Sequence, residues 1–129
     1  MPTLVFDFGY RFIGVAVAEI VFGTTSPIKT IHAKKGTPNW TEIDLLVREW
    51  SPTGLVVGLP VNMDDSESPM SAACRKFGSL LFKRYSLKVE YADERLSTFE
   101  ARGRSGRSQP DHAIAATIIA ETWMNHKDS

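Results

Sequence analysis

Residues 3–19, TLVFDFGYRFIGVAVAE, contain two runs of β-forming residues separated by a short turn. Thr3–Phe8 and Phe12–Glu19 are the two runs, and this pattern is typical of a β-hairpin. Asp7 lies inside the first run, where a carboxylate costs free energy unless a partner compensates for its burial. We therefore expect Asp7 to be either an aspartate bonded to backbone amides or a metal ligand or general base at a strand end.

Beyond this hairpin the chain adds a third strand and then alternates between helices and strands. Apolar spacing and turn residues predict strands over 27–33, 54–59 and 87–92, and helices over 40–50, 69–85 and 110–126. Three consecutive strands followed by strand–helix alternation predict an α/β fold. We expect a mixed five-stranded sheet, an antiparallel three-strand meander plus parallel strands, flanked by helices. The length fits a single domain over residues 1–129.

Composition excludes several classes of protein. Fifteen basic residues balance fifteen acidic ones, so any affinity for a polyanion must come from a local patch. Cys74 is the only cysteine, which excludes an internal disulfide and a multi-cysteine zinc site. The N-terminus lacks the pattern of a signal peptide, and no apolar run approaches the ~20 residues of a membrane span. We expect a cytoplasmic protein that does not bind membranes.

Two further acidic positions could meet Asp7 beside the sheet. Asp93 and Glu94 directly follow the last predicted strand, although a solvated acidic turn would look the same in sequence. Asp111 begins the last helix in an S-x-x-D pattern that is typical of a helix cap. It also shares one helix face with apolar residues, so we expect it to point inward near the end of the sheet.

Carboxylates from three distant segments would form an oxygen-only site. Such ligands select hard cations, and Mg²⁺ or Mn²⁺ suits them best. Two such ions can activate water and stabilise the leaving oxygen of a phosphodiester. A basic segment lies between the second and third acidic positions, and it contains Arg95, Arg102, Arg104 and Arg107. It is either a solvated loop or a clamp for the phosphates of a nucleic acid.

Four motifs in this order resemble those of the YqgF/RuvX family. They are the D-x-G-x-x-x-I-G-V-A opening at 7–16, G-L-P-x-N-M-D at 58–64, D-E-R-L-S-T-x-E-A at 93–101 and D-x-x-A-A at 111–116. Together they span nearly the whole chain. In one respect the chain departs from the family pattern, because only residues 103–110 separate Arg102 from Asp111, where the family usually has a longer segment.

The resemblance implies a ribonuclease H-like fold, also seen in Holliday-junction resolvases of the RuvC type. It implies a metal-dependent nuclease that processes the 5′ end of pre-16S ribosomal RNA in ribosome biogenesis. By the family pattern, Asp7, Asp111 and one of Asp93 and Glu94 would form the catalytic metal centre, with Glu94 favoured. Arg11, Asn62 and the four arginines of the basic segment are the predicted nucleic-acid contacts.

Two alternatives remain open at the level of sequence. The first is a DNA nuclease that resolves branched junctions, which would normally act as a dimer. The second is a ribosome-assembly factor that binds nucleic acid without catalysis. We expect pre-16S rRNA as the partner, with branched DNA as the alternative and a ribosomal particle as a further partner. The protein itself is expected to be a monomer or a weak homodimer.

Overall fold

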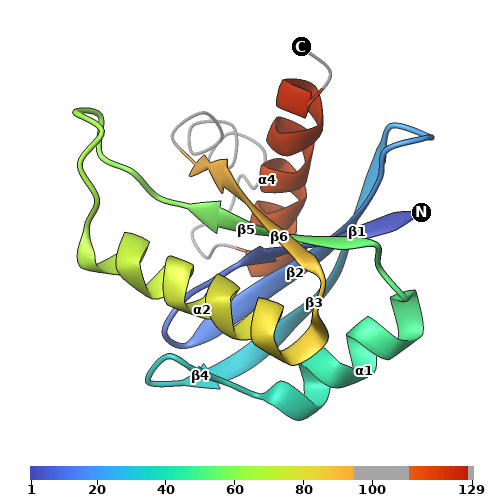
Figure 1. Cartoon of the computed structure of the whole chain (residues 1–129), viewed down its shortest axis with the longest axis horizontal. Coiled ribbons are helices and arrows are strands. Elements are labelled where there is room, and N and C mark those ends of the chain that lie inside the picture. The colour runs from blue at the N-terminus through green and yellow to red at the C-terminus, as the bar shows by residue number, and fades with distance from the viewer. Residues whose placement is uncertain (95–110, 128–129) are drawn as a thin grey trace.

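The computed structural model describes residues 1–94 and 111–127, which form one sheet with helices on both faces (Figure 1). Its strands are β1 (Pro2–Asp7), β2 (Phe12–Glu19), β3 (Thr24–Lys34), β4 (Thr37–Pro38), β5 (Gly54–Leu59) and β6 (Lys88–Asp93). Its helices are α1 (Trp40–Trp50), α2 (Pro69–Tyr85) and α4 (His112–Lys127). Among the described residues, no helix is both long and apolar enough to cross a membrane.

The sheet is mixed, in the order β4-β3-β2-β1-β5-β6. Strands β1, β2 and β3 form an antiparallel meander, and β5 and β6 continue the sheet in parallel with β1. This arrangement confirms the predicted α/β fold class. Because β1 and β5 run in parallel, their carboxyl ends meet at one edge of the sheet, where ligands of such folds gather.

The predicted number of five strands is wrong, because β4 adds a sixth. The stretch around Gly36 reads as a break in the sequence, but Lys35 (φ 51°) and Gly36 (φ 85°) form a two-residue turn. Positive φ at both positions is the signature of a tight hairpin turn. The turn returns the chain for two residues beside β3, and Pro38 is tolerated there because an edge strand need not donate its amide.

Alternation along the strands divides the core between the two faces. Leu4 and Phe6 of β1 pack with the residues of α1 and α2 in the larger cluster. Val5 belongs to the second cluster, with Ile119 and Trp123 of α4. Asp7 follows Val5 with the period of two that a strand imposes, so its side chain lies on the α4 face of the sheet.

Helix α4 lies directly on β2, where Gly14 permits an unusually close approach. A Cβ atom at Gly14 would lie 1.8 Å from the carbonyl oxygen of His112. The buried side of α4 includes Ile118 and Ile119, and it extends to Ala113, Ala116 and Ala120. Small side chains let this helix sit close to the strands, so its buried surface is wider than a simple apolar stripe predicts.

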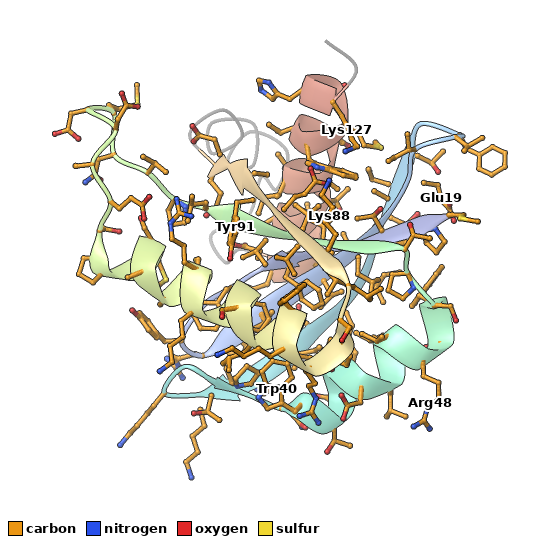
Figure 2. The ribbon with its side chains drawn as sticks, in the orientation of Figure 1. Glu19, Trp40, Arg48, Lys88, Tyr91 and Lys127 are labelled. Carbon is orange, nitrogen blue, oxygen red and sulfur yellow. The ribbon has the colours of Figure 1, made fainter. Side chains whose placement is uncertain are left out.

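The opposite face is closed by α1 and α2. Asn39 caps α1 by accepting a hydrogen bond from the amide of Glu42. Trp40 then packs against α2, with ring centroids 6.0 Å from Phe77 and 6.5 Å from Tyr85 (Figure 2). This aromatic contact closes the lower end of the larger core cluster.

Candidate active site

Asp7 is the last residue of β1, at the end of the sheet where the carboxyl ends of the parallel strands lie. Its register partner on β2 is Gly14, the residue beneath the start of α4. The aspartate is half-buried, between the sheet and the first turn of that helix. The β1–β2 hairpin therefore presents a carboxyl group at the junction of the sheet and α4.

Glu94 reaches Asp7 from β6, although β5 lies between the two strands. Gly58 of β5 makes this possible, since a Cβ atom there would lie 3.1 Å from both Cγ and Cδ of Glu94. The same Cβ atom would lie 2.6 Å from Cδ1 of Ile119. The absence of a side chain at Gly58 thus opens the space that the Glu94 side chain occupies.

Burial governs the protonation of this pair. It raises the pKa of Asp7 to about 6, against the opposing effects of the hydrogen bond with Glu94 and the charge of His112. It raises the pKa of Glu94 to about 8, and the negative charge of Asp7 adds to that rise. Burial therefore favours the protonated form of Glu94, which donates a hydrogen bond to the Asp7 carboxylate.

The structure separates Asp93 from Glu94, which the sequence leaves open. Asp93 is the last residue of β6 and pairs in register with Leu59. It follows Ala92, which belongs to the α4-side cluster, so strand alternation turns Asp93 to the opposite face. Glu94 is the member of this acidic pair that the structure shows hydrogen-bonded to Asp7.

Asp111 caps α4. Its Oδ1 accepts hydrogen bonds from the amides of Ala113 (3.0 Å) and Ile114 (3.2 Å), and the residue is exposed. The helix begins one residue later, at His112, so Asp111 does not follow the inward-facing helical stripe that its spacing suggests. It nevertheless lies on the same end of the sheet as Asp7, because His112 rests on Gly14.

An open hollow of about 480 Å³ lies over Asp7. Its lining includes the exposed Arg11 and the ring of Phe12 from the β1–β2 hairpin, and His112 from α4. The Arg11 guanidinium lies 5.8 Å from the Phe12 ring centroid, and His112 stacks on the same ring at 4.9 Å. Arg11 therefore brings a positive charge to the hollow that Asp7 lines.

His112 is a feature of the site that the sequence interpretation missed. The available signal in the sequence was that His112 directly follows Asp111. A helix that begins close to Asp7 also places its own first residue, here His112, close to Asp7.

Asn62 lies in a compact exposed loop after β5. Its side-chain amide donates to Oγ of Ser66 (2.9 Å), and Asp64 accepts from the same hydroxyl (2.6 Å). The start of α2 is tied to the end of β5, because the Ser71 hydroxyl donates to the carbonyl of Pro60. Predicted contacts Arg95, Arg102, Arg104 and Arg107 lie outside the described residues.

The carboxyl pair fits a hard divalent cation. Two adjacent, half-buried carboxylates repel each other once both ionise, and a cation between them removes that penalty. Mg²⁺ is commonly bound through one or two carboxylates while it keeps several waters. Within residues 1–94 and 111–127, no three His, Cys, Asp or Glu side chains are grouped for metal binding. The structure thus brings together Asp7 and Glu94, and it leaves Asp111 at the rim.

Comparison with known proteins places this geometry among nucleases. A protein of Nitrosococcus oceani named "Putative pre-16S rRNA nuclease" is 47% identical over 134 residues, covering 98% of this chain and 88% of that protein. A protein of the same name from Legionella pneumophila is 43% identical, covering 95% and 94%. The first alignment is longer than this chain, so that relative carries additional residues within the matched region.

Solved structures agree with the fold. RuvC of Thermus thermophilus in complex with a Holliday junction substrate matches with a TM-score of 0.59 at 12% identity, covering 100% of this chain and 96% of that one. The fowlpox virus Holliday junction resolvase matches with a TM-score of 0.53 at 12% identity, covering 98% and 99%. These likenesses confirm the predicted ribonuclease H-like fold. A family model described as "RuvX: Holliday junction resolvase" matches residues 1–126, and with these relatives it shows that the chain belongs to the RuvX family.

Proposed function

We propose that this protein is a metal-dependent nuclease that hydrolyses pre-16S rRNA at the Asp7–Glu94 site. Its family and its curated relatives are those of a nuclease, an enzyme that hydrolyses phosphodiester bonds. The observation that carries the proposal is the pair of carboxyl groups held together at the open edge of the sheet. A protein that only bound RNA would gain nothing from clustered acids facing phosphates.

Asp7 and Glu94 are the residues that would hold Mg²⁺ or Mn²⁺, with Asp111 proposed as a third ligand. A bound divalent cation supplies a more acidic water and stabilises charge on the leaving oxygen. The protein's own contribution is to keep two carboxyl groups buried and adjacent. Because burial favours the protonated form of Glu94, a cation held by its carboxylate would displace that proton, and affinity should rise with pH.

Other residues of the hollow orient the substrate. Arg11 lies at the exposed side of the hollow, where its guanidinium can donate to a phosphate of the bound strand. The stacked rings of Phe12, from the β1–β2 hairpin, and His112, from α4, form one wall of the hollow. We include the four arginines of the basic segment and Asn62 as further proposed contacts to the RNA backbone.

The decisive experiment is cleavage of a labelled RNA that carries the 5′ leader of pre-16S rRNA. The natural protein is compared with Asp7→Asn in Mg²⁺, in Mn²⁺ and in EDTA. We expect cleavage that needs the cation and falls at least 100-fold in Asp7→Asn. Folded protein that leaves the RNA intact in every condition would contradict the proposal.

A second candidate function, cleavage of branched DNA, is favoured by the printed description of the family. It is tested by replacing the RNA with a four-way DNA junction in the same assay. Cleavage of the junction in preference to the leader RNA would make DNA the substrate. Binding of either nucleic acid without cleavage by the natural protein would instead support an assembly factor.

The setting of the reaction forms part of the proposal. We place the enzyme in the cytoplasm, acting as a monomer or weak homodimer on RNA presented by a ribosomal particle. Co-sedimentation with precursor particles of the small subunit tests the association, and light scattering tests the oligomeric state. Migration apart from such particles, with full cleavage of free RNA, would show that the particle is dispensable.

A further inference from the structure

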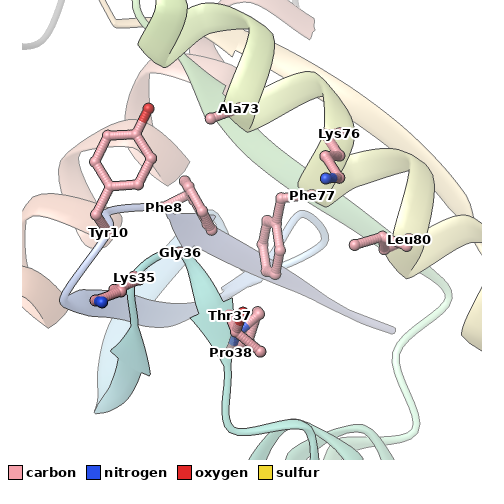
Figure 3. Close-up of a pocket in the computed structure, with 10 residues that line it drawn as sticks. All are labelled: Phe8, Tyr10, Lys35, Gly36, Thr37, Pro38, Ala73, Lys76, Phe77 and Leu80. Carbon is pink, nitrogen blue, oxygen red and sulfur yellow. The ribbon is translucent and has the colours of Figure 1, made fainter.

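A second hollow lies on the other side of the β1–β2 turn, between that turn, the β3–β4 hairpin and α2 (Figure 3). Its volume is about 210 Å³, below the roughly 300–1,000 Å³ that is typical of sites for drug-sized ligands. This size suits a single planar ring. The hollow is mainly apolar at its base and carries two lysines at its rim.

Aromatic rings build its base and one wall. Phe8 and Phe77 are buried, with ring centroids 4.9 Å apart, and they are fixed by the core. Tyr10 meets Phe8 edge to face at 6.1 Å, and it remains 45% exposed. One aromatic ring is thus supported from behind by buried rings while much of its surface stays open to a ligand.

The β3–β4 hairpin holds Tyr10 in place through the backbone. The amide of Gly36 donates to the carbonyl of Tyr10 at 2.9 Å, and the amide of Ala33 donates to the carbonyl of Arg11 at 2.8 Å. The Tyr10 ring also packs against Gly36, where a Cβ atom would lie 3.2 Å from Cδ1. The wall is therefore preorganised, and replacing the Tyr10 side chain leaves the backbone hydrogen bonds that position it.

The two rim lysines, Lys35 and Lys76, give the hollow a positive edge. Within the described part of the chain, neither ammonium group lies in salt-bridge distance of a carboxylate. Arg75 shows the contrast, because it neighbours Lys76 on α2 and is held by Glu67 at 2.7 Å. An apolar ring site edged by two cations complements a base flanked by phosphates.

The position of this hollow connects it to the active site. Phe8 and Tyr10 line both hollows, so the β1–β2 turn is all that separates the second hollow from Asp7. We propose that the second hollow binds one base of a single-stranded RNA, which stacks on Tyr10 while Lys35 and Lys76 contact the adjacent phosphates. This subsite rests on the proposed nuclease function, and it would hold a nucleotide next to the bond that is cut.

The subsite is tested by the affinity of a labelled single-stranded RNA, measured by fluorescence anisotropy in EDTA in an Asp7→Asn background that prevents cleavage. Tyr10→Leu removes the ring and should weaken binding roughly tenfold, the scale of one lost base–aromatic stack. Tyr10→Phe keeps the ring and should bind as the background does. An RNA that lacks the one base proposed to occupy the hollow should bind the Asp7→Asn protein as weakly as the intact RNA binds the Tyr10→Leu variant. For this abasic RNA, Tyr10→Leu should weaken binding no further.

The lysines are tested through the dependence of affinity on salt. Lys35→Asn removes the charge and suits the left-handed turn, so the hairpin is preserved. It and Lys76→Ala should each lower the slope of log affinity against log salt by roughly 0.7, the value for one phosphate of a single strand. Lys88→Ala is the matched control, because Lys88 is exposed and begins β6 at the opposite end of the sheet from Asp7.

The outcomes separate this subsite from the nuclease function. Suppose that Tyr10→Leu and Tyr10→Phe bind RNA with equal affinity while the natural protein still cleaves RNA in the presence of a cation. That result would overturn the subsite alone. Failure of the Asp7→Asn protein to bind RNA, together with absence of cleavage by the natural protein, would overturn both. Weakening by Tyr10→Leu without cleavage by the natural protein would keep the subsite and remove the nuclease.

Discussion

Glu94, the residue after β6, donates a hydrogen bond to Asp7 at the end of β1, across the space that Gly58 leaves open on the intervening strand β5. The contact joins the carboxyl ends of β1 and β6 and brings two acidic side chains of the site together. Asp7 and Glu94 belong to two different RuvX family motifs, at 7–16 and 93–101. Gly58, in the third motif at 58–64, leaves the space in which their side chains meet.

Glu94→Gln should abolish cleavage, whereas Asp93→Asn should reduce it less than tenfold. Glu94 is bonded to Asp7, while Asp93 alternates to the other face of the sheet. Initial rates of RNA cleavage at saturating Mg²⁺ measure the difference, with urea unfolding as the check on folding. Equal losses in the two variants would show that both acids serve the cation.

Gly58→Ala should displace the Glu94 side chain and cost about 1–3 kcal/mol of stability, since it overpacks a filled site. Its Cβ atom would meet Ile119 at 2.6 Å and Glu94 at 3.1 Å. Gly54→Ala on the same strand is the control, because its nearest contact would be an ordinary 3.7 Å. Urea unfolding and cleavage rates should both fall in the first variant and stay near the natural values in the second. A Gly58→Ala protein with full activity would mean that Glu94 is not needed where the structure places it.

Asp111→Asn should retain the helix cap and lose cleavage by 100-fold or more if Asp111 ligates the cation as proposed. Asparagine caps helices as well as aspartate does, so stability should change by less than about 0.5 kcal/mol. Asp111→Ala serves as the comparison that also removes the cap, at a cost of about 1 kcal/mol. Unchanged activity in Asp111→Asn would leave this residue a structural cap alone.

The stability of the metal-free protein should fall as pH rises from about 5 to 8. Burial raises the pKa of Asp7 from 3.8 to about 6 and that of Glu94 from 4.5 to about 8. The folded state then binds protons that the unfolded state has already released, so folding is favoured at the acidic end of this window. We expect a fall of about 1–3 kcal/mol in the free energy of unfolding, measured with urea in EDTA.

Glu94→Gln is the control for this pH dependence, and it should flatten the decline. Mg²⁺ should stabilise the natural protein more at pH 8 than at pH 5, because protons compete with the cation for the same oxygens. An identical pH profile in the natural protein and in Glu94→Gln would show that the pair does not titrate as a unit.

Much of the fold was predictable because its signals are local. The pattern that predicts each of these elements lies within a short stretch of neighbouring residues. The structure confirms three of them: the hairpin of residues 3–19, the strand at 54–59 and the helix at 69–85. The short strand β4 was not predictable in this way. Its pairing depends on a turn at Lys35 and Gly36 whose left-handed conformation no apolar pattern reports.

By itself, the sequence determined the family, the α/β class and the placement of Asp7 at the end of a buried strand. Tertiary structure alone decided that Glu94 and not Asp93 joins Asp7, that Gly58 makes room for it, and that His112 enters the site. The physical reason is that these three facts depend on the order of strands in the sheet and on which face each side chain meets. Neighbouring residues along a strand look alike in sequence, but alternation sends them to opposite sides of the sheet.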